Sequence, residues 1–241
     1  MIETFAALYF AHILADFVLQ TNWMATNKAG PRAVLLHGLA VLGTAALALG
    51  TLHPVLIALT AAHLGLDLIK ANRRGIWPFL ADQAAHLVSV VVVTALLPSL
   101  WAQGAWANLP ALPGVMALTA GFILTTRAGG FAVAQLMEPW ASATTPEGLP
   151  SGGLIGGGRA IGNLERGVIF LLVLLGQAAG IGFLIAAKSV LRFGSVNDDR
   201  KFSEYVIIGT LASFGWAIAA SFATLRLLAA LPPIGIPGLT P

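Results

Sequence analysis

Long apolar runs dominate the chain, and several of them reach or approach the length of a membrane-spanning helix. Hydrophobic residues make up 57% of the 241 residues, charged residues make up only 10%, and the mean hydropathy is +0.85. Soluble domains carry about 25% charged residues, and a helix needs about 20 mostly apolar residues to cross a bilayer. The sequence therefore predicts an all-α, polytopic integral membrane protein. It contains no cysteine, which excludes disulfides and thiolate metal ligands.

The apolar pattern predicts about seven transmembrane helices and one short interfacial helix. The expected spans are residues 3–21, 33–50, 52–70, 79–98, 112–127, 166–187 and 204–230, and the interfacial helix is FAVAQLMEPW at 131–140. This pattern predicts four parts: a four-helix half (1–110), a transmembrane plus interfacial helix (111–140), a Gly/Pro/Ser-rich connector (141–165) and C-terminal helices (166–241). The run GGLIGGGRAIG lacks nucleotide-binding spacing, so it is interpreted as part of a flexible connector.

Basic residues are unevenly divided among the connections between the expected spans. The connections after the first, third and fifth spans contain Lys or Arg, whereas the second and fourth contain neither. The positive-inside rule therefore predicts that the basic connections are cytoplasmic and that the N-terminus lies on the opposite side. The net charge of +3 is explained by topology, and the basic residues form no surface for nucleic acid.

The first span carries a polar stripe in the run AHILADFVLQT. His12, Asp16 and Gln20 are four residues apart, so they share one face of a helix. Similar residues recur in the next three spans, as His37, as His63 with Asp67, and as Asp82 with His86. Chance predicts only about 0.4 acidic residues four positions from a histidine in this composition, and such i,i+4 partners touch on a helix. The sequence contains three such pairs, far more than chance predicts.

Depth in the membrane strengthens the pattern. If successive helices are antiparallel, the four histidines lie in one layer beneath the cytoplasmic surface, and the three aspartates lie one turn nearer the water. An acid within a span costs about 2.5–3.5 kcal/mol on insertion scales, so these side chains should face one another rather than lipid. We expect all seven to converge, with His37 at the edge because its own helix supplies no acidic partner.

Three interpretations of this cluster remain: a metal centre, a proton relay in which each aspartate orients its histidine, and interhelical hydrogen bonding. The metal interpretation predicts one or two divalent ions, such as zinc, iron or manganese, with ligands drawn from His12, Asp16, His37, His63, Asp67, Asp82 and His86. Gln20 and Gln83 would hydrogen-bond to the ligands. In a catalytic centre the metal would activate water and Asp16, Asp67 or Asp82 would act as base, hydrolysing a membrane-embedded ester or phosphoester.

Several motifs also resemble a known family. The segments HILADFVLQTNWMATNK, HLGLDLIK and FLADQAAH, and further on GRAIGNLERGVIFLLVLLGQ and EYVIIGTLASF, resemble the bacterial inner-membrane family called domain of unknown function 3307. The His/Asp helices are more loosely similar to small membrane-bound metal-dependent hydrolases. The resemblance implies a multi-pass protein of the bacterial inner membrane, in contact with membrane lipids. The alternative function is a non-catalytic subunit or assembly factor of a larger membrane complex, or a homo-oligomer.

The C-terminal half carries charges but no histidine. Lys188 and Arg192 are one turn apart at the end of the sixth expected span, which indicates either a site for an anion or lipid head group or charges that extend to the membrane surface. We expect Glu165, Arg166, Lys188, Arg192 and Glu204 to pair among themselves or to contact head groups.

Overall fold

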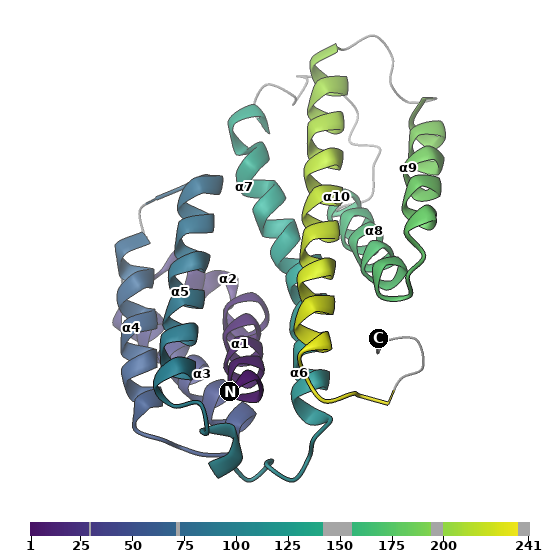
Figure 1. Cartoon of the computed structure of the whole chain (residues 1–241). Helices are drawn as coiled ribbons and strands as arrows, with labels where there is room; N and C mark the ends of the chain where they lie inside the picture. The colour runs from purple at the N-terminus through teal and green to yellow at the C-terminus, as the bar shows by residue number, and fades with distance from the viewer. Residues whose placement is uncertain (29, 71–72, 142–155, 194–199, 236–241) are drawn as a thin grey trace. The chain divides into compact units, whose positions relative to one another are not determined.

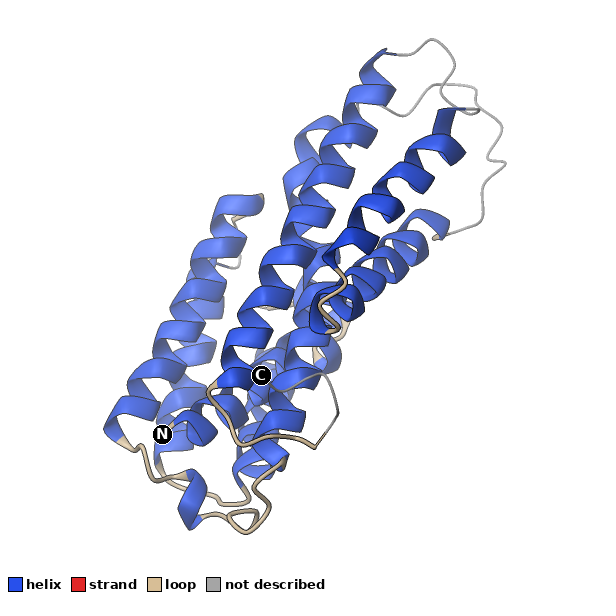
Figure 2. Ribbon diagram, turned by 45° about the vertical axis from the view of Figure 1, so that its right-hand side comes forward, coloured by secondary structure: helices blue, strands red, loops and turns tan. Residues whose placement is uncertain are grey.

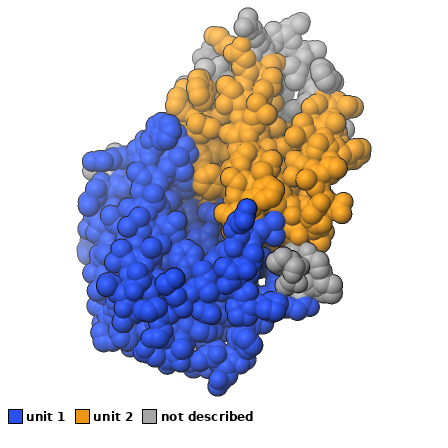
Figure 3. Space-filling view, viewed as in Figure 1, with its two compact units in different colours: residues 1–124, 224–241 blue, residues 125–223 orange. Residues whose placement is uncertain are grey.

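A computed structural model describes residues 1–28, 30–70, 73–141, 156–193 and 200–235 of the chain. Every regular element in this part is helical, and the described residues contain no strand (Figure 2). The chain forms two compact units, Met1–Leu124 with Thr224–Pro241, and Thr125–Ala223 (Figure 3). The predicted all-α class is therefore confirmed.

The first unit contains the helices of the N-terminal half. They are α1 (Ile2–Leu14), the π-helical turn η1 (Ala15–Leu19), α2 (Asn22–Thr26), α3 (Pro31–Leu49), α4 (Val55–Lys70), α5 (Ile76–Leu96), the 3₁₀ turn η2 (Trp101–Gln103) and α6 (Leu112–Ile123). Helix α1 packs against α3, α5 and α6, while α4 packs against α3 and α5 (Figure 1). Helices α1, α3, α4 and α5 therefore surround a shared interior.

Small side chains allow α1 to lie close to its neighbours. Ala6, Ala7, Ala11 and Ala15 are at most 2% exposed, and small residues at helix interfaces are the usual means of close approach within membranes. Buried Thr4 also fixes α1 to the segment after α5, because its hydroxyl donates to the Pro98 carbonyl and accepts from the Trp101 N–H.

The hairpin between α3 and α4 depends on a glycine. Helix α3 ends at Gly50, whose φ of 68° is left-handed, and the Thr51 N–H returns to the Ala46 carbonyl. This backbone arrangement is a standard C-terminal stop for a helix. The Gly50 carbonyl then accepts from the Ala105 N–H, so the later loop packs directly on the turn.

The second unit comprises the π-helical turn η3 (Leu124–Ala128) from residue 125 onwards, α7 (Gly129–Ala141), α8 (Gly157–Leu174), α9 (Ala178–Phe193) and most of α10 (Arg200–Ala229). Two expectations differ from this arrangement. Residues 131–140 are not a separate interfacial helix, because Leu112–Ala141 is one 30-residue apolar helical segment that includes η3. The expected span 166–187 is divided into α8 and α9 by Gly176, which has a φ of 68°.

The expected connector also changes. Residues 142–155 lie outside the described part of the chain, but α8 begins at Gly157, so the residues from 157 to 165 are helical. Helices α8 and α9 pack together, and Gly180 approaches Leu172 so closely that a Cβ at Gly180 would lie 2.8 Å from Leu172 Cδ2. Gly176 therefore makes a turn and Gly180 a close helix contact within the run that was expected to be one continuous span.

Five described helical segments are long and apolar enough to cross a membrane. They are Ile2–Leu19, Pro31–Leu49, Ile76–Leu96, Leu112–Ala141 and Ser203–Ala229. These lengths and compositions indicate a multi-pass membrane protein, although the expected number of seven spans is not confirmed. Helix α4, with 16 residues, is shorter than these segments.

Helix α5 shows that polar residues face inwards and apolar residues face outwards. Asp82 and His86 are buried, whereas Val88, Val91 and Val92 are 61%, 49% and 49% exposed. Helix α4 follows the same rule, since His63 and Asp67 are buried and Ile69 is 67% exposed. This is the pattern expected of helices whose solvent is lipid and whose polar residues serve the interior.

The turn after α3 gives a direct test of the fold. Gly50→Ala should lower the free energy of unfolding by at least about 1–2 kcal/mol, because a left-handed residue with a Cβ costs about that much. The new Cβ would also lie 2.8 Å from Trp106 Cδ1. Thermal unfolding of detergent-purified protein measures the effect. Gly43→Ala, which has open space around it inside α3, is the control and should not destabilise; equal losses in both variants would contradict the packing.

Candidate metal centre

The first four long helices each place one histidine in their shared interior. His12 lies on α1, His37 on α3, His63 on α4 and His86 on α5, and all four are at most 7% exposed. The carboxylates come from Asp16 in η1, Asp67 in α4 and Asp82 in α5, with side chains 4–9% exposed. The structure thus brings together all seven residues that the sequence singled out.

Asp16 lies in a π-helical turn. At the end of η1 the Gln20 N–H bonds to the Ala15 carbonyl, five residues back, rather than four as in an α-helix. Such turns occur frequently at functional sites. The carboxylate of Asp16 faces His37 and His63, which belong to two other helices.

The His–Asp pairs that lie four residues apart in the sequence are too far apart for hydrogen bonds. The imidazole nitrogens and carboxylate oxygens of His12–Asp16, His63–Asp67 and His86–Asp82 are each 3.8 Å apart. A hydrogen bond between these groups requires about 2.7–3.2 Å. An aspartate therefore does not orient the histidine of its own helix, and the closer contacts run between helices.

Four ligand-type atoms from three segments, η1, α3 and α4, lie close together. Asp16 Oδ1 lies 3.1 Å from His63 Nε2 and 3.5 Å from His37 Nε2. His37 Nε2 lies 3.1 Å from His63 Nε2 and 3.2 Å from Asp67 Oδ2, while His63 Nε2 lies 3.8 Å from Asp67 Oδ2. We call Asp16, His37, His63 and Asp67 the central group.

The spacing of the central group matches a metal coordination shell. Nitrogen and oxygen ligands lie about 2.0–2.2 Å from zinc, so two ligands of a tetrahedral site are about 3.3–3.6 Å apart. The measured separations of 3.1–3.8 Å bracket that value. Two imidazole nitrogens and two carboxylate oxygens also hold too few protons to hydrogen-bond in every direction, and a bound cation would accept the lone pairs that remain.

Two lysines bind the outer side of the cluster. Lys28 Nζ donates to Asp67 Oδ1, and Lys70 Nζ donates to Asp82 Oδ2, both at 2.6 Å. The second oxygen of each carboxylate faces a histidine of the cluster. The sequence analysis assigned these lysines only to topology. The i,i+3 spacing of Asp67 and Lys70 would have suggested an ion pair between these two residues, whereas Lys70 pairs with Asp82.

The two glutamines take different places beside the cluster. Gln83 Nε2 donates to Asp82 Oδ2 at 3.2 Å, which is the contact to a carboxylate that the sequence analysis expected. Gln20 lines a narrow crevice with Met24 and Lys28 that leads to His37 and Asp67. The remaining histidine, His53, lies outside the cluster and accepts a hydrogen bond from the Val55 N–H at the start of α4.

His37 differs from expectation. It was expected at the edge because α3 carries no acid, but its Nε2 contacts the carboxylates of both Asp16 and Asp67. The acids come from the neighbouring helices, and no spacing within α3 could reveal them. His37 therefore belongs to the centre of the cluster.

The charges of the C-terminal half form separate contacts within the second unit. Lys188 Nζ donates to Glu165 Oε2 at 2.7 Å, as the expected pairing of charges requires. Arg166 is only 4% exposed, and it donates to the Thr126 carbonyl, Ser213 Oγ and Asn163 Oδ1. Glu204 is exposed on α10. The side chain of Arg192 lies outside the described residues, so the anion site with Lys188 stays a prediction.

Comparison with known proteins concerns the segment that carries the cluster. Residues 4–108 match the model of a family described as Protein of unknown function (DUF3307). This match confirms the resemblance that was inferred from the motifs of the same segment. The DUF3307 match includes all four histidines, all three aspartates and both lysines of the cluster. It ends before the C-terminal motifs. Searches of curated proteins and of solved structures found no match.

The lysine contacts generate a prediction about stability. Lys70→Ala should lower the free energy of unfolding by about 1–3 kcal/mol, because it leaves a buried carboxylate without its cation; breaking a fully buried pair costs about 3–5 kcal/mol. Thermal unfolding in detergent measures the loss. Arg73→Ala, an exposed residue of the same connection, is the matched control and should be neutral. A neutral Lys70→Ala would show that the ion pair does not support the cluster.

Proposed function

We propose that the protein is a multi-pass protein of the bacterial inner membrane that binds a divalent transition metal ion through the central group. The observation that carries the proposal is the close approach of Asp16 Oδ1, His37 Nε2 and His63 Nε2 in the buried interior, with Asp67 Oδ2 3.2 Å from His37 Nε2. Imidazole with carboxylate suits zinc, iron and manganese. Lys28 would keep Asp67 in place by holding its other oxygen.

Metal analysis of the purified protein tests the proposal. The full chain, purified in detergent without chelator, should carry close to stoichiometric transition metal. His37→Ala and Asp67→Asn should each remove the metal of the central group, and the double variant should lose no more than either single variant, because both residues serve one site. His53→Ala should retain full metal content, since His53 lies outside the cluster. Folded wild-type protein that is repeatedly metal-free would refute the proposal.

A proton relay is the second candidate, and one observation favours it. The four imidazoles form a continuous series, with ring centroids 5.1 Å apart for His37 and His63, 4.0 Å for His63 and His86, and 5.2 Å for His86 and His12. Histidine series of this kind conduct protons in membrane transporters. Metal-free wild-type protein that moves protons across vesicle membranes, and loses this activity in His63→Ala, would establish the relay in place of the metal site.

The catalytic form of the proposal is hydrolysis of an ester or phosphoester in a membrane-embedded substrate. A bound metal would lower the pKa of the water molecule that it coordinates. Asp82 is the carboxylate best placed to accept a proton, because its Oδ1 is buried without a hydrogen-bond partner while Lys70 and Gln83 hold Oδ2. Asp16 and Asp67 would serve as ligands. The alternative role, as a subunit or assembly factor of a larger membrane complex or as a homo-oligomer, stays a prediction.

Hydrolysis has its own test. Metal-loaded protein in vesicles of mixed phospholipids should release fatty acid or phosphate, and Asp82→Asn should lower the rate by at least 100-fold, in line with the loss of general base catalysis. Gln103→Glu, at an exposed position near η2, is the control and should leave the rate unchanged. If metal-loaded protein releases neither product, the hydrolase proposal is wrong, but the proposed metal site is not affected.

A further inference from the structure

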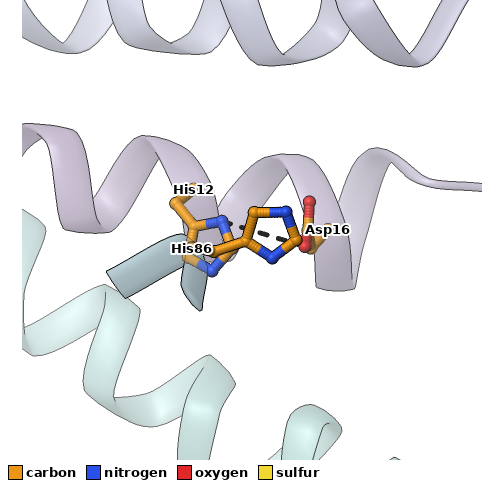
Figure 4. Close-up of side chains that lie close together, drawn as sticks. All are labelled: His12, Asp16 and His86. Atoms are coloured by element: carbon orange, nitrogen blue, oxygen red, sulfur yellow. Dashed lines mark ion pairs between the residues drawn. The ribbon is translucent and has the colours of Figure 1, made fainter. Parts of the chain in front are cut away.

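A second group of ligand-type atoms lies beside the central group and shares Asp16 with it. One ligand atom each of His12, Asp16 and His86 lies within 4.8 Å of the other two (Figure 4). His12 Nδ1 is 3.8 Å from Asp16 Oδ2, the oxygen that does not face His37 and His63. The two oxygens of one carboxylate thus point towards two different sets of histidines.

The tautomer of His86 leaves a lone pair directed into this second group. His86 Nε2 lies 3.3 Å from the His63 carbonyl oxygen. A carbonyl has no proton to give, so Nε2 must be the donor, and Nδ1 of the neutral ring carries the lone pair. A histidine that donates one ring nitrogen to a carbonyl and turns the other inward is the usual arrangement of a metal ligand.

Two buried imidazole nitrogens of this group have no hydrogen-bond partner. They are His12 Nδ1 and His86 Nδ1. Their residues are only 7% and 2% exposed, so water from the surface does not satisfy them. Buried polar atoms are hydrogen-bonded in the great majority of cases, and unsatisfied ones require an explanation. A cation bound between the two rings would satisfy both nitrogens at once, each through its lone pair.

We propose that the protein binds a second divalent metal ion through His12 and His86, with Asp16 as the bridge to the ion in the central group. Asp82 Oδ1, 3.8 Å from His86 Nδ1, lies beside this second site as the proposed proton acceptor. The inference rests on the proposed function, since a bridge requires the first ion. Two-metal sites with ions about 3.5–4 Å apart are typical of enzymes that cleave phosphoesters. The second site therefore favours a phosphoester as the substrate class.

The stoichiometry and magnetism of bound manganese test the second site. The full chain in detergent, loaded with Mn²⁺ alone and freed of excess, should bind two equivalents, and its electron paramagnetic resonance spectrum should show coupling between two ions. His12→Ala and His86→Ala should each lower the content to one equivalent and abolish the coupling. His53→Ala is the matched control and should keep two coupled ions.

Each outcome separates this inference from the proposed function. One equivalent in wild-type protein, retained in His12→Ala and lost in His37→Ala, would overturn the second site and leave the first intact. Two equivalents without magnetic coupling would overturn the bridging role of Asp16. No bound metal would overturn both. The wild-type spectrum decides the question even if a histidine variant fails to fold.

Discussion

The burial of three carboxylates among four imidazoles between helices is the constraint on which the first unit depends. Carboxylates in lipid are costly, so the polar faces of the helices that carry them must meet. The structure satisfies part of this demand with Lys28 and Lys70, each of which holds one carboxylate oxygen. The oxygens that remain face histidines, and five atoms of the cluster have no hydrogen-bond partner: His12 Nδ1, Asp16 Oδ1, His37 Nδ1, Asp82 Oδ1 and His86 Nδ1. A divalent cation is the ligand whose charge and coordination suit them.

The packing of the surrounding helices makes this interior small. Alanines along α1 allow the neighbouring helices to approach, and a threonine hydroxyl on α3 (Thr44) bonds to the Ala11 carbonyl close to His12. The glycine turn after α3 returns the chain so that α4 lies beside it. Four histidines from four helices consequently reach one space, which no single helix could supply. The coordination-like distances follow from helix packing rather than from local sequence spacing.

Much of the candidate site could be predicted from the sequence, because hydropathy and helical periodicity are local properties. The apolar runs of α1, α3 and α5 appear at nearly their observed positions, and the i,i+4 pairs mark three of the four histidines that converge. Predictions failed where backbone conformation departs from a regular α-helix. The turn at Gly176 divides an apolar run that looks continuous, and η3 joins two segments that look separate.

The sequence by itself determined that the helices are apolar enough for a lipid environment. It also determined which polar residues should face one another rather than lipid. An apolar majority and a few polar residues at helical spacing suffice for that, since each is a property of neighbouring positions. Only the tertiary structure decided which atoms meet. It placed His37 at the centre, paired Lys70 with Asp82 instead of Asp67, and turned Asp16 between two sets of histidines. These contacts join residues on different helices, so they depend on how the helices pack and on a π-helical turn, which periodicity along one helix does not encode.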